Sequence, residues 1–347
     1  MSERAAKNVY RAQAVPPGVR LKLDANELPG ADPAWFAGFD PERAARYPES
    51  GVLEHLIARR HATTTDRVLV TAGGDEAIER LTRVAAGPDA PVVAATPTFE
   101  MIPRYAVMAG ARFVGVPWAD DSAFPVGHVL KTVAAEGAGL LALVTPNNPT
   151  GRVIARAEAE RMIAAASCPV MLDLAYAEFA ADDLTDLAVS GTGVVAIRTF
   201  SKAWGLAGLR VGYAVGDPGL IESMRSAGGP YSVSGIARAV AERALSAYPD
   251  WLDSRLRRVH NERSRLVGLC SKLGLAVLPS EANFVLIRSG RAERLWQGLL
   301  DRGVLVRRWH DRPGLADALR ISIPAEAADA DTLMRAIESA VGQEDAR

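Results

Sequence analysis

A lysine and an arginine stand eight residues apart in the segment RTFSKAWGLAGLR, residues 198–210. Lys202 follows a Thr-Phe-Ser turn and precedes small apolar residues, a poor environment for a charge. Burying an ammonium group is costly unless its pKa falls or it gains a partner. A lysine of lowered pKa can attack carbonyl groups and carry protons. Most lysines instead extend from a loop into solvent, so the rest of the chain has to decide between the two interpretations.

A second candidate site lies in TAGGDEAIERL, residues 71–81. Gly74 lies at the end of an apolar run, and Asp75 and Glu76 begin a helical pattern. The free N–H groups of that first helical turn could bind an anion, but a plain turn with acidic N-capping has the same pattern. The segment lacks the GK[ST] sequence of a P-loop.

Two turns carry side chains that could contact a ligand. In TPTFEM, residues 96–101, Phe99 could stack on a flat heterocycle or serve as a core aromatic. In TPNNPTGRV, residues 145–153, the Asn-Pro and Pro-Thr-Gly sequences favour a tight turn. Such a turn would fix the amide of Asn148, which could then hydrogen-bond a ligand oxygen.

Asp173 ends an otherwise apolar run in MLDLAYAEF, residues 171–179. A carboxylate there needs a partner, which a bound cation or a buried ion pair could supply. Tyr176 follows three residues later and can face the same site.

Short apolar runs alternate with helical patterns from about residue 46 to residue 216. Runs that are apolar on both sides of the pleat, separated by helices, predict a mostly parallel sheet covered on both faces. Ligands of such sheets bind at the carboxyl ends of the strands. The seven predicted strands are 67–72, 91–96, 111–118, 140–146, 169–175, 194–200 and 210–216.

The chain divides into three predicted parts. Residues 1–45 form an irregular N-terminal arm, expected to pack with the small domain and a partner subunit. Residues 46–245 form a large α/β domain. Residues 246–347 form a smaller α+β domain that begins with a long amphipathic helix over 251–273.

Composition excludes several classes of protein. Hydrophobic residues make up 49% and charged residues 23%, which is typical of a globular protein. Forty basic and 41 acidic residues give a net charge of −1, which argues against nucleic acid or an anionic membrane as partner. No apolar run is long enough for a membrane span or a signal peptide, so the expected location is the cytoplasm. The two cysteines and five histidines lack metal-ligand spacing, which predicts no metal site.

The motifs gain specificity from their combination and order. GGDEA, TPTF, PNNPTG, an Asp and a Tyr three residues apart, and SK with an arginine eight residues on resemble the fold-type I pyridoxal 5′-phosphate (PLP) aminotransferases. RYPES, FSKAWGLAGLRVGY, PYSVS, EANFVL and LRISI are similar to the histidinol-phosphate aminotransferase branch. The resemblance covers nearly the whole chain from about residue 10.

This resemblance implies roles for the residues at the cofactor. Lys202 would form the Schiff base with PLP and move the proton between substrate and cofactor. Asp173 would pair with the ring nitrogen and keep it protonated, so that the ring can accept electrons. Asn148 and Tyr176 would bond the ring's 3′-oxygen, and Phe99 would stack on the ring.

The resemblance also implies a phosphate site for the cofactor. Ser201 and Arg210 match the family's phosphate ligands. They would be joined by the GGDEA motif with Gly74, Asp75 and Glu76, whose amides lie at a helix N-terminus.

A homodimer with shared active sites is implied as well. Tyr47, in RYPES, matches the tyrosine that reaches the cofactor phosphate of the neighbouring subunit. Arg307 and Arg320, thirteen residues apart on strand-like segments, match an arginine pair that grips the substrate phosphate or the glutamate carboxylate. Tyr10 matches an N-terminal tyrosine that reaches the same phosphate from the partner subunit, and Asn26 is expected to contact the substrate.

The chain departs from the family pattern at four positions. Gly74 replaces the serine of GSDE, Leu174 the glutamate of DEAY, and Ser232 the asparagine of PYN, while Pro324 stands where glycine is common. None of these changes removes a side chain assigned to PLP. Leu174 and Ser232 are expected near the active site, where they bear on the substrate.

The activity implied is transamination of L-histidinol phosphate with 2-oxoglutarate to imidazole acetol phosphate and L-glutamate, a step of histidine biosynthesis. Two other enzymatic activities stay open: transamination of an aromatic or specialised amino acid, and PLP-dependent decarboxylation of phosphothreonine. A PLP-sensing effector domain of a transcription regulator is disfavoured, because no helix-turn-helix pattern precedes the arm.

Overall fold

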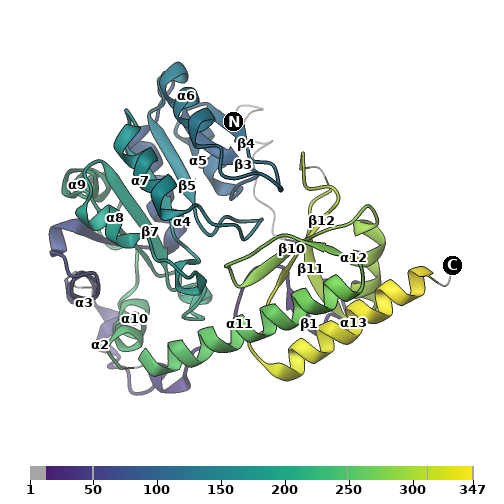
Figure 1. Ribbon diagram of the computed structural model, residues 1–347. Coiled ribbons are helices and arrows are strands. Elements are labelled where there is room, and N and C mark those ends of the chain that lie inside the picture. The colour runs from purple at the N-terminus through teal and green to yellow at the C-terminus, as the bar shows by residue number, and fades with distance from the viewer. Residues whose placement is uncertain (1–12, 49–50, 248, 311, 346–347) are drawn as a thin grey trace.

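The computed structural model describes residues 13–48, 51–247, 249–310 and 312–345. The chain forms two β-sheets with helices packed around them (Figure 1). The predicted α/β class with a mostly parallel seven-stranded sheet is confirmed.

The larger sheet contains all seven strands expected from the apolar runs. Only β8 runs against its two neighbours, β2 and β7, and the other described pairs in this sheet are parallel. In spatial order the strands are β2 (Val68–Thr71), β8 (Gly212–Gly216), β7 (Val194–Thr199), β6 (Val170–Asp173), β5 (Leu140–Val144), β3 (Val92–Thr96) and β4 (Phe113–Pro117).

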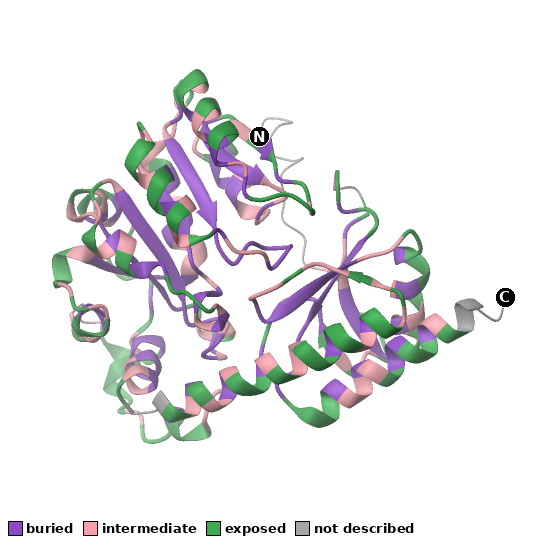
Figure 2. Ribbon diagram, in the orientation of Figure 1, coloured by how far each residue is buried: buried purple, intermediate pink, exposed green. Residues whose placement is uncertain are grey.

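Both faces of this sheet are buried, as continuous apolar strands require. On β5, Leu141 and Leu143 pack into one apolar cluster, while Leu140 and Ala142 pack into another. One face is covered by α4 (Gly73–Ala85), α5 (Met101–Met108) and α9 (Pro218–Ser226). The other face is covered by α3 (Val52–Arg60), α6 (Val126–Glu136), α7 (Arg156–Ala165), α8 (Thr185–Ser190) and α10 (Gly235–Ala247). The buried strands inside these layers are visible in Figure 2.

The smaller sheet combines the C-terminal part of the chain with one strand from the N-terminal arm. β1 (Leu21–Leu23) pairs in parallel with β11 (Val304–Arg308) at the edge of this sheet. The order continues through β12 (Ala318–Ser322), β10 (Phe284–Arg288) and β9 (Ala276–Val277). The helices of this region are α11 (Pro249–Lys272), α12 (Ala292–Asp301) and α13 (Ala327–Asp345), and a short α2 (Glu42–Ala45) lies further toward the N-terminus.

The arm therefore contributes to the smaller sheet, while the domain boundaries at residues 45 and 245 remain predictions. In Figure 1, α11 runs along the smaller sheet from the end of α10. Among the described residues, no helix combines the length and apolar character needed to cross a bilayer.

Candidate active site

A cavity of about 450 Å³ is lined by residues from the larger sheet, the smaller sheet and the arm. Because the carboxyl ends of parallel strands meet at one edge, side chains that follow different strands converge there. Twelve of the fifteen predicted site residues line this cavity: Asn26, Gly74, Asp75, Phe99, Asn148, Asp173, Tyr176, Ser201, Lys202, Arg210, Arg307 and Arg320.

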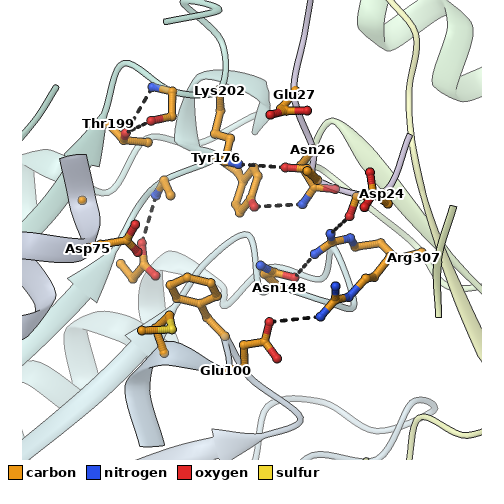
Figure 3. A pocket seen from close by; sticks show the side chains of 18 of the residues that line it. Asp24, Asn26, Glu27, Asp75, Glu100, Asn148, Tyr176, Thr199, Lys202 and Arg307 are labelled. Atoms are coloured by element: carbon orange, nitrogen blue, oxygen red, sulfur yellow. Dashed lines mark hydrogen bonds and ion pairs between the residues drawn. The ribbon is translucent and has the colours of Figure 1, made fainter. Parts of the chain in front are cut away.

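Lys202 lies just beyond the end of β7 and points into the cavity (Figure 3). Its Nζ donates a hydrogen bond to the carbonyl of Ala25 at 3.2 Å, so the arm and the lysine segment meet at this point. Burial lowers the pKa of Lys202 to about 8, and the nearby guanidinium of Arg320 contributes in the same direction. An appreciable fraction of this amine is therefore neutral near pH 8 and able to act as nucleophile or base.

Asp173 is the last residue of β6, and its side chain is 3% exposed. Its Oδ1 accepts a hydrogen bond from the backbone N–H of Ala175 at 3.2 Å. In the described part of the chain it forms no salt bridge, and burial raises its pKa to about 7. The predicted alternative of a buried ion pair is thus not found there. A carboxylate in this position would be stabilised by a cationic ligand group.

Arg210, Ser201 and the start of α4 form a cradle suited to an anion. Arg210 Nη1 donates to Ser201 Oγ at 3.3 Å, and Nη2 lies 2.8 Å from Asp75 Oδ2. The amides of the first turn of α4, a helix of 13 residues, add partial positive charge. Gly73 has a φ of 77°, a left-handed conformation that favours glycine, and a Cβ there would displace the guanidinium of Arg210.

A polar network links the arm to both sheets. Asn26 donates through Nδ2 to the hydroxyl of Tyr176 at 2.9 Å, and its backbone N–H donates to Ser322 Oγ at 2.9 Å. Arg320 Nη1 donates to Asn148 Oδ1 at 2.6 Å, and its Nη2 donates to the carbonyl of Asp24. These bonds fix the side chains that the sequence predicts at the ring oxygen and at the substrate.

Arg307 and Arg320 are directly opposite each other on the antiparallel strands β11 and β12. Like charges in this position are destabilising unless an anion or counterion lies near them. Arg307 Nη2 is 3.3 Å from Glu100 Oε1, and both guanidinium groups lie within 6 Å of the ring centre of Trp309. The partners of Arg320 are neutral oxygen atoms, and burial lowers its pKa. This pair is well suited to bind an anion.

Two of the predicted site residues that the structure describes do not line the cavity. Glu76 pairs with Arg80 at 2.6 Å and accepts from the N–H of Ala72, so its carboxylate supports the turn before α4 and is no cavity ligand. Tyr47 is 78% exposed and stacks on Tyr231. Tyr10 lies outside the described residues.

Leu174 and Ser232, two of the four departures from the family pattern, do not line the cavity. Leu174 is buried in the apolar core, and Ser232 accepts a hydrogen bond from Arg80 at 3.4 Å. Neither residue lines the cavity, in contrast to the expectation that they bear on the substrate. A Cβ on Gly74 would meet Ile197 at an ordinary 3.5 Å, so packing does not require glycine there.

Several cavity residues were missed by the sequence reasoning. They include the Ala25 carbonyl, Thr199, Glu100, Trp309 and Arg312. Glu100 could have been suspected as the neighbour of Phe99, and Arg312 as a third arginine between Arg307 and Arg320. Thr199 Oγ1 accepts from the N–H of Ser201 at 3.1 Å, a local contact for which the sequence carries no distinct signal.

Residues 21–339 match the family model "Aminotransferase class I and II". The chain belongs to this family. A histidinol-phosphate aminotransferase of Roseiflexus castenholzii is 38% identical over 87% of this chain and 85% of its own length. One from Neisseria meningitidis is 34% identical over 93% of this chain and 91% of its own length.

This chain is also similar to a solved structure of a histidinol-phosphate aminotransferase. The crystal structure of histidinol-phosphate aminotransferase from Sinorhizobium meliloti in complex with pyridoxal-5′-phosphate superposes with a TM-score of 0.84 at 27% identity. The superposition covers 94% of this chain and 92% of the chain in the crystal structure. The predicted membership of the fold-type I aminotransferases and their histidinol-phosphate branch is confirmed.

Proposed function

We propose that this aminotransferase uses PLP to transfer the amino group of L-histidinol phosphate to 2-oxoglutarate, giving imidazole acetol phosphate and L-glutamate in histidine biosynthesis. One observation carries the proposal: a lysine, an unpaired buried carboxylate, an anion cradle and two opposed arginines converge on one cavity. The relatives of 30% identity or more named above are histidinol-phosphate aminotransferases, so the aromatic-amino-acid and decarboxylase alternatives are not favoured.

The residues of the cavity fit PLP in charge and in position. Arg210, Ser201 and the α4 amides would hold its phosphate, which would take over the guanidinium that now pairs with Asp75. Asp173 would hold the protonated ring nitrogen, which supplies the cation that this buried carboxylate otherwise lacks. Lys202 would bind the aldehyde carbon of PLP covalently.

Each of the cavity side chains named above would have a separate role in the reaction. When bound, PLP supplies an electron sink for the carbanion formed at the substrate Cα. Lys202, with its lowered pKa, would move the proton between that carbon and the C4′ carbon of the cofactor. Tyr176 and Asn148 would orient the ring through its 3′-oxygen, and Phe99 would stack on the ring. Arg307 and Arg320 would hold the distal anion of either substrate.

An amino-donor screen tests the proposal. The purified holoenzyme is mixed with L-histidinol phosphate, L-histidinol, L-phenylalanine or O-phospho-L-threonine, and conversion of bound PLP to its amine form is followed by absorbance. We expect L-histidinol phosphate to convert the cofactor fastest. Equal rates with L-phenylalanine would favour the specialised-amino-acid alternative, and release of carbon dioxide from phosphothreonine would favour the decarboxylase.

Replacement of the two arginines should separate the substrates. Arg320→Ala should weaken binding of both histidinol phosphate and glutamate by roughly 2–5 kcal/mol, because each anion would lose a buried partner. Arg307→Ala should raise the KM of histidinol phosphate more than that of unphosphorylated histidinol. Arg308→Ala is the matched control, since Arg308 lies on the same strand and pairs with Glu293 outside the cavity. Equal effects of Arg307→Ala on both donors would contradict the assignment.

A homodimer with shared active sites is part of the proposal. Exposed large hydrophobic side chains gather near α3 and the start of α10, including Tyr47, Val52, Tyr231 and Ile236. Such a group is typical of a protein–protein contact surface. Tyr47, which does not line its own cavity, would then reach the partner's cofactor phosphate. The cytoplasmic location stays a prediction.

Mixing two defective variants tests the shared sites. In a hybrid of Lys202→Ala and Tyr47→Ala subunits, one site keeps both its own lysine and the partner's tyrosine. Under exchange conditions an equal mixture should therefore recover up to about a quarter of wild-type activity, although each variant alone is impaired. An active protein that sediments as a monomer would contradict the proposal.

A further inference from the structure

One end of the cavity holds three arginine side chains, Arg307, Arg312 and Arg320, and one carboxylate in ion-pair range of two of them, Glu100. Arg320 forms no salt bridge within the described ranges, since its printed partners are an amide oxygen and a carbonyl. Asp24 also lies near Arg320, and Arg104 lies near Arg312, so arginines outnumber acidic side chains among the described residues at this end.

The side chain of Glu100 does not cap the helix that follows it, although acidic side chains often do so at this position. It is the N-cap residue of α5, but its side chain makes no capping hydrogen bond. The carboxylate instead faces the cavity, with Oε1 3.3 Å from Arg307 Nη2 and Oε2 4.0 Å from Arg312 Nη1. Figure 3 shows Glu100 and Arg307 pointing toward one another.

Arg312 lies on the loop between β11 and β12 and is held against the segment that carries Phe99 and Glu100. Its Nη2 donates to the carbonyl of Thr98. Burial lowers the pKa of Arg312, and the nearby Arg307 acts in the same direction, while Glu100 opposes the shift. Its second guanidinium nitrogen is thereby directed toward the carboxylate and the cavity.

We propose that Glu100 is an internal counterion that competes with the distal anion of the substrate for Arg307 and Arg312, and that Arg312 is a third anion-binding residue. This inference rests on the proposed function, in which the same arginines must hold a phosphate dianion in one half-reaction and a carboxylate monoanion in the other. The excess of arginines over acidic side chains at this end suits the phosphate dianion.

The counterion affects the two substrates unequally. At a given distance a carboxylate repels a dianion twice as strongly as a monoanion. Glu100 therefore weakens phosphate binding more than carboxylate binding. It brings the two affinities closer together, and it keeps inorganic phosphate from blocking the arginines.

Titration of holoenzymes with inorganic phosphate at pH 8, followed by calorimetry, tests the counterion without turnover. With PLP in place its own phosphate site is filled, so the titration reports the substrate end. Glu100→Gln keeps the size of the side chain and removes its charge. We expect this variant to bind phosphate about tenfold tighter than wild type, and the dicarboxylate glutarate by a smaller factor. Arg312→Gln should bind phosphate about tenfold more weakly.

A matched control separates the local effect from the change in net charge. Arg308 follows Arg307 on β11 and pairs with Glu293. Glu293→Gln breaks this ion pair and should leave the affinity for phosphate within about twofold of wild type. In steady-state kinetics, Glu100→Gln should lower the KM of the phosphorylated donor more than that of glutamate.

The possible results distinguish this inference from the function on which it rests. If Arg307→Gln weakens phosphate binding but Glu100→Gln binds it no more tightly than wild type, the counterion is refuted and the proposed substrate stands. If Arg312→Gln binds phosphate as wild type does, its role as a third ligand is refuted. If Arg307→Gln has no effect either, the arginine site fails together with both proposals.

Discussion

Lys202→Ala is expected to reduce transamination by roughly 10⁴-fold or more, because in the proposed function this lysine is both the covalent attachment point of PLP and the proton carrier. The structure supports both roles, since the amine lies in the cavity with its pKa lowered to about 8. The substitution removes one hydrogen bond to the Ala25 carbonyl, so the fold should survive. Donor-dependent conversion of the cofactor, measured in single turnover, gives the loss directly.

Two controls make this result specific to Lys202. Borohydride reduction of the wild-type holoenzyme should fix the cofactor on the peptide that contains Lys202, as read by mass spectrometry. Lys131→Ala, on the exposed surface of α6, should leave turnover unchanged. Full transamination by the Lys202→Ala variant would refute the assignment of the lysine.

Asp173→Asn is expected to leave PLP bound but to lower the rate by about 10²–10³-fold, the usual cost of losing one preorganised electrostatic partner. A neutral amide cannot hold the ring nitrogen protonated, so the ring withdraws electrons less strongly. Each lost 1.4 kcal/mol or so of transition-state stabilisation costs about tenfold in rate. A variant with wild-type rates would show that Asp173 does not pair with the ring.

In the protein without cofactor, Asp173→Asn should be favourable: it should stabilise the folded state. Burial raises the pKa of Asp173 to about 7 in the folded chain, against about 3.9 when unfolded. Its contribution to stability is therefore present below pH 4 and is lost as the pH rises through 7. At pH 8 the Asp173→Asn apoprotein should melt a few °C above wild type, and the difference should vanish toward pH 4. Equal melting temperatures at both pH values would contradict the buried-charge account.

The sequence alone determined the larger sheet and the position of its active edge. Strands such as β5 are buried on both faces, so their composition is continuously apolar and is easily recognised. Parallel strands bring their carboxyl ends to one edge, and residues that follow them must meet there. For this reason the sequence alone predicts that Asp173 and Lys202 lie in one site.

The tertiary structure alone decided which polar groups face each other across that site. Thirteen residues separate Arg307 and Arg320, but only the register of β11 on β12 makes them direct cross-strand neighbours. Glu76 has the same local sequence signal as Asp75, yet its carboxylate turns to Arg80 because that arginine lies one helical turn away. Neither outcome follows from residue type.

Long-range contacts explain the parts of the site that local sequence patterns do not show. Asn26 joins the site because β1 pairs with β11, nearly 300 residues further along the chain. Glu100 meets Arg312 because a loop of the smaller sheet packs against the end of β3. Sequence patterns report burial and local geometry, which depend on neighbouring residues. The partners of a buried charge depend on how distant segments pack, and only the folded chain fixes them.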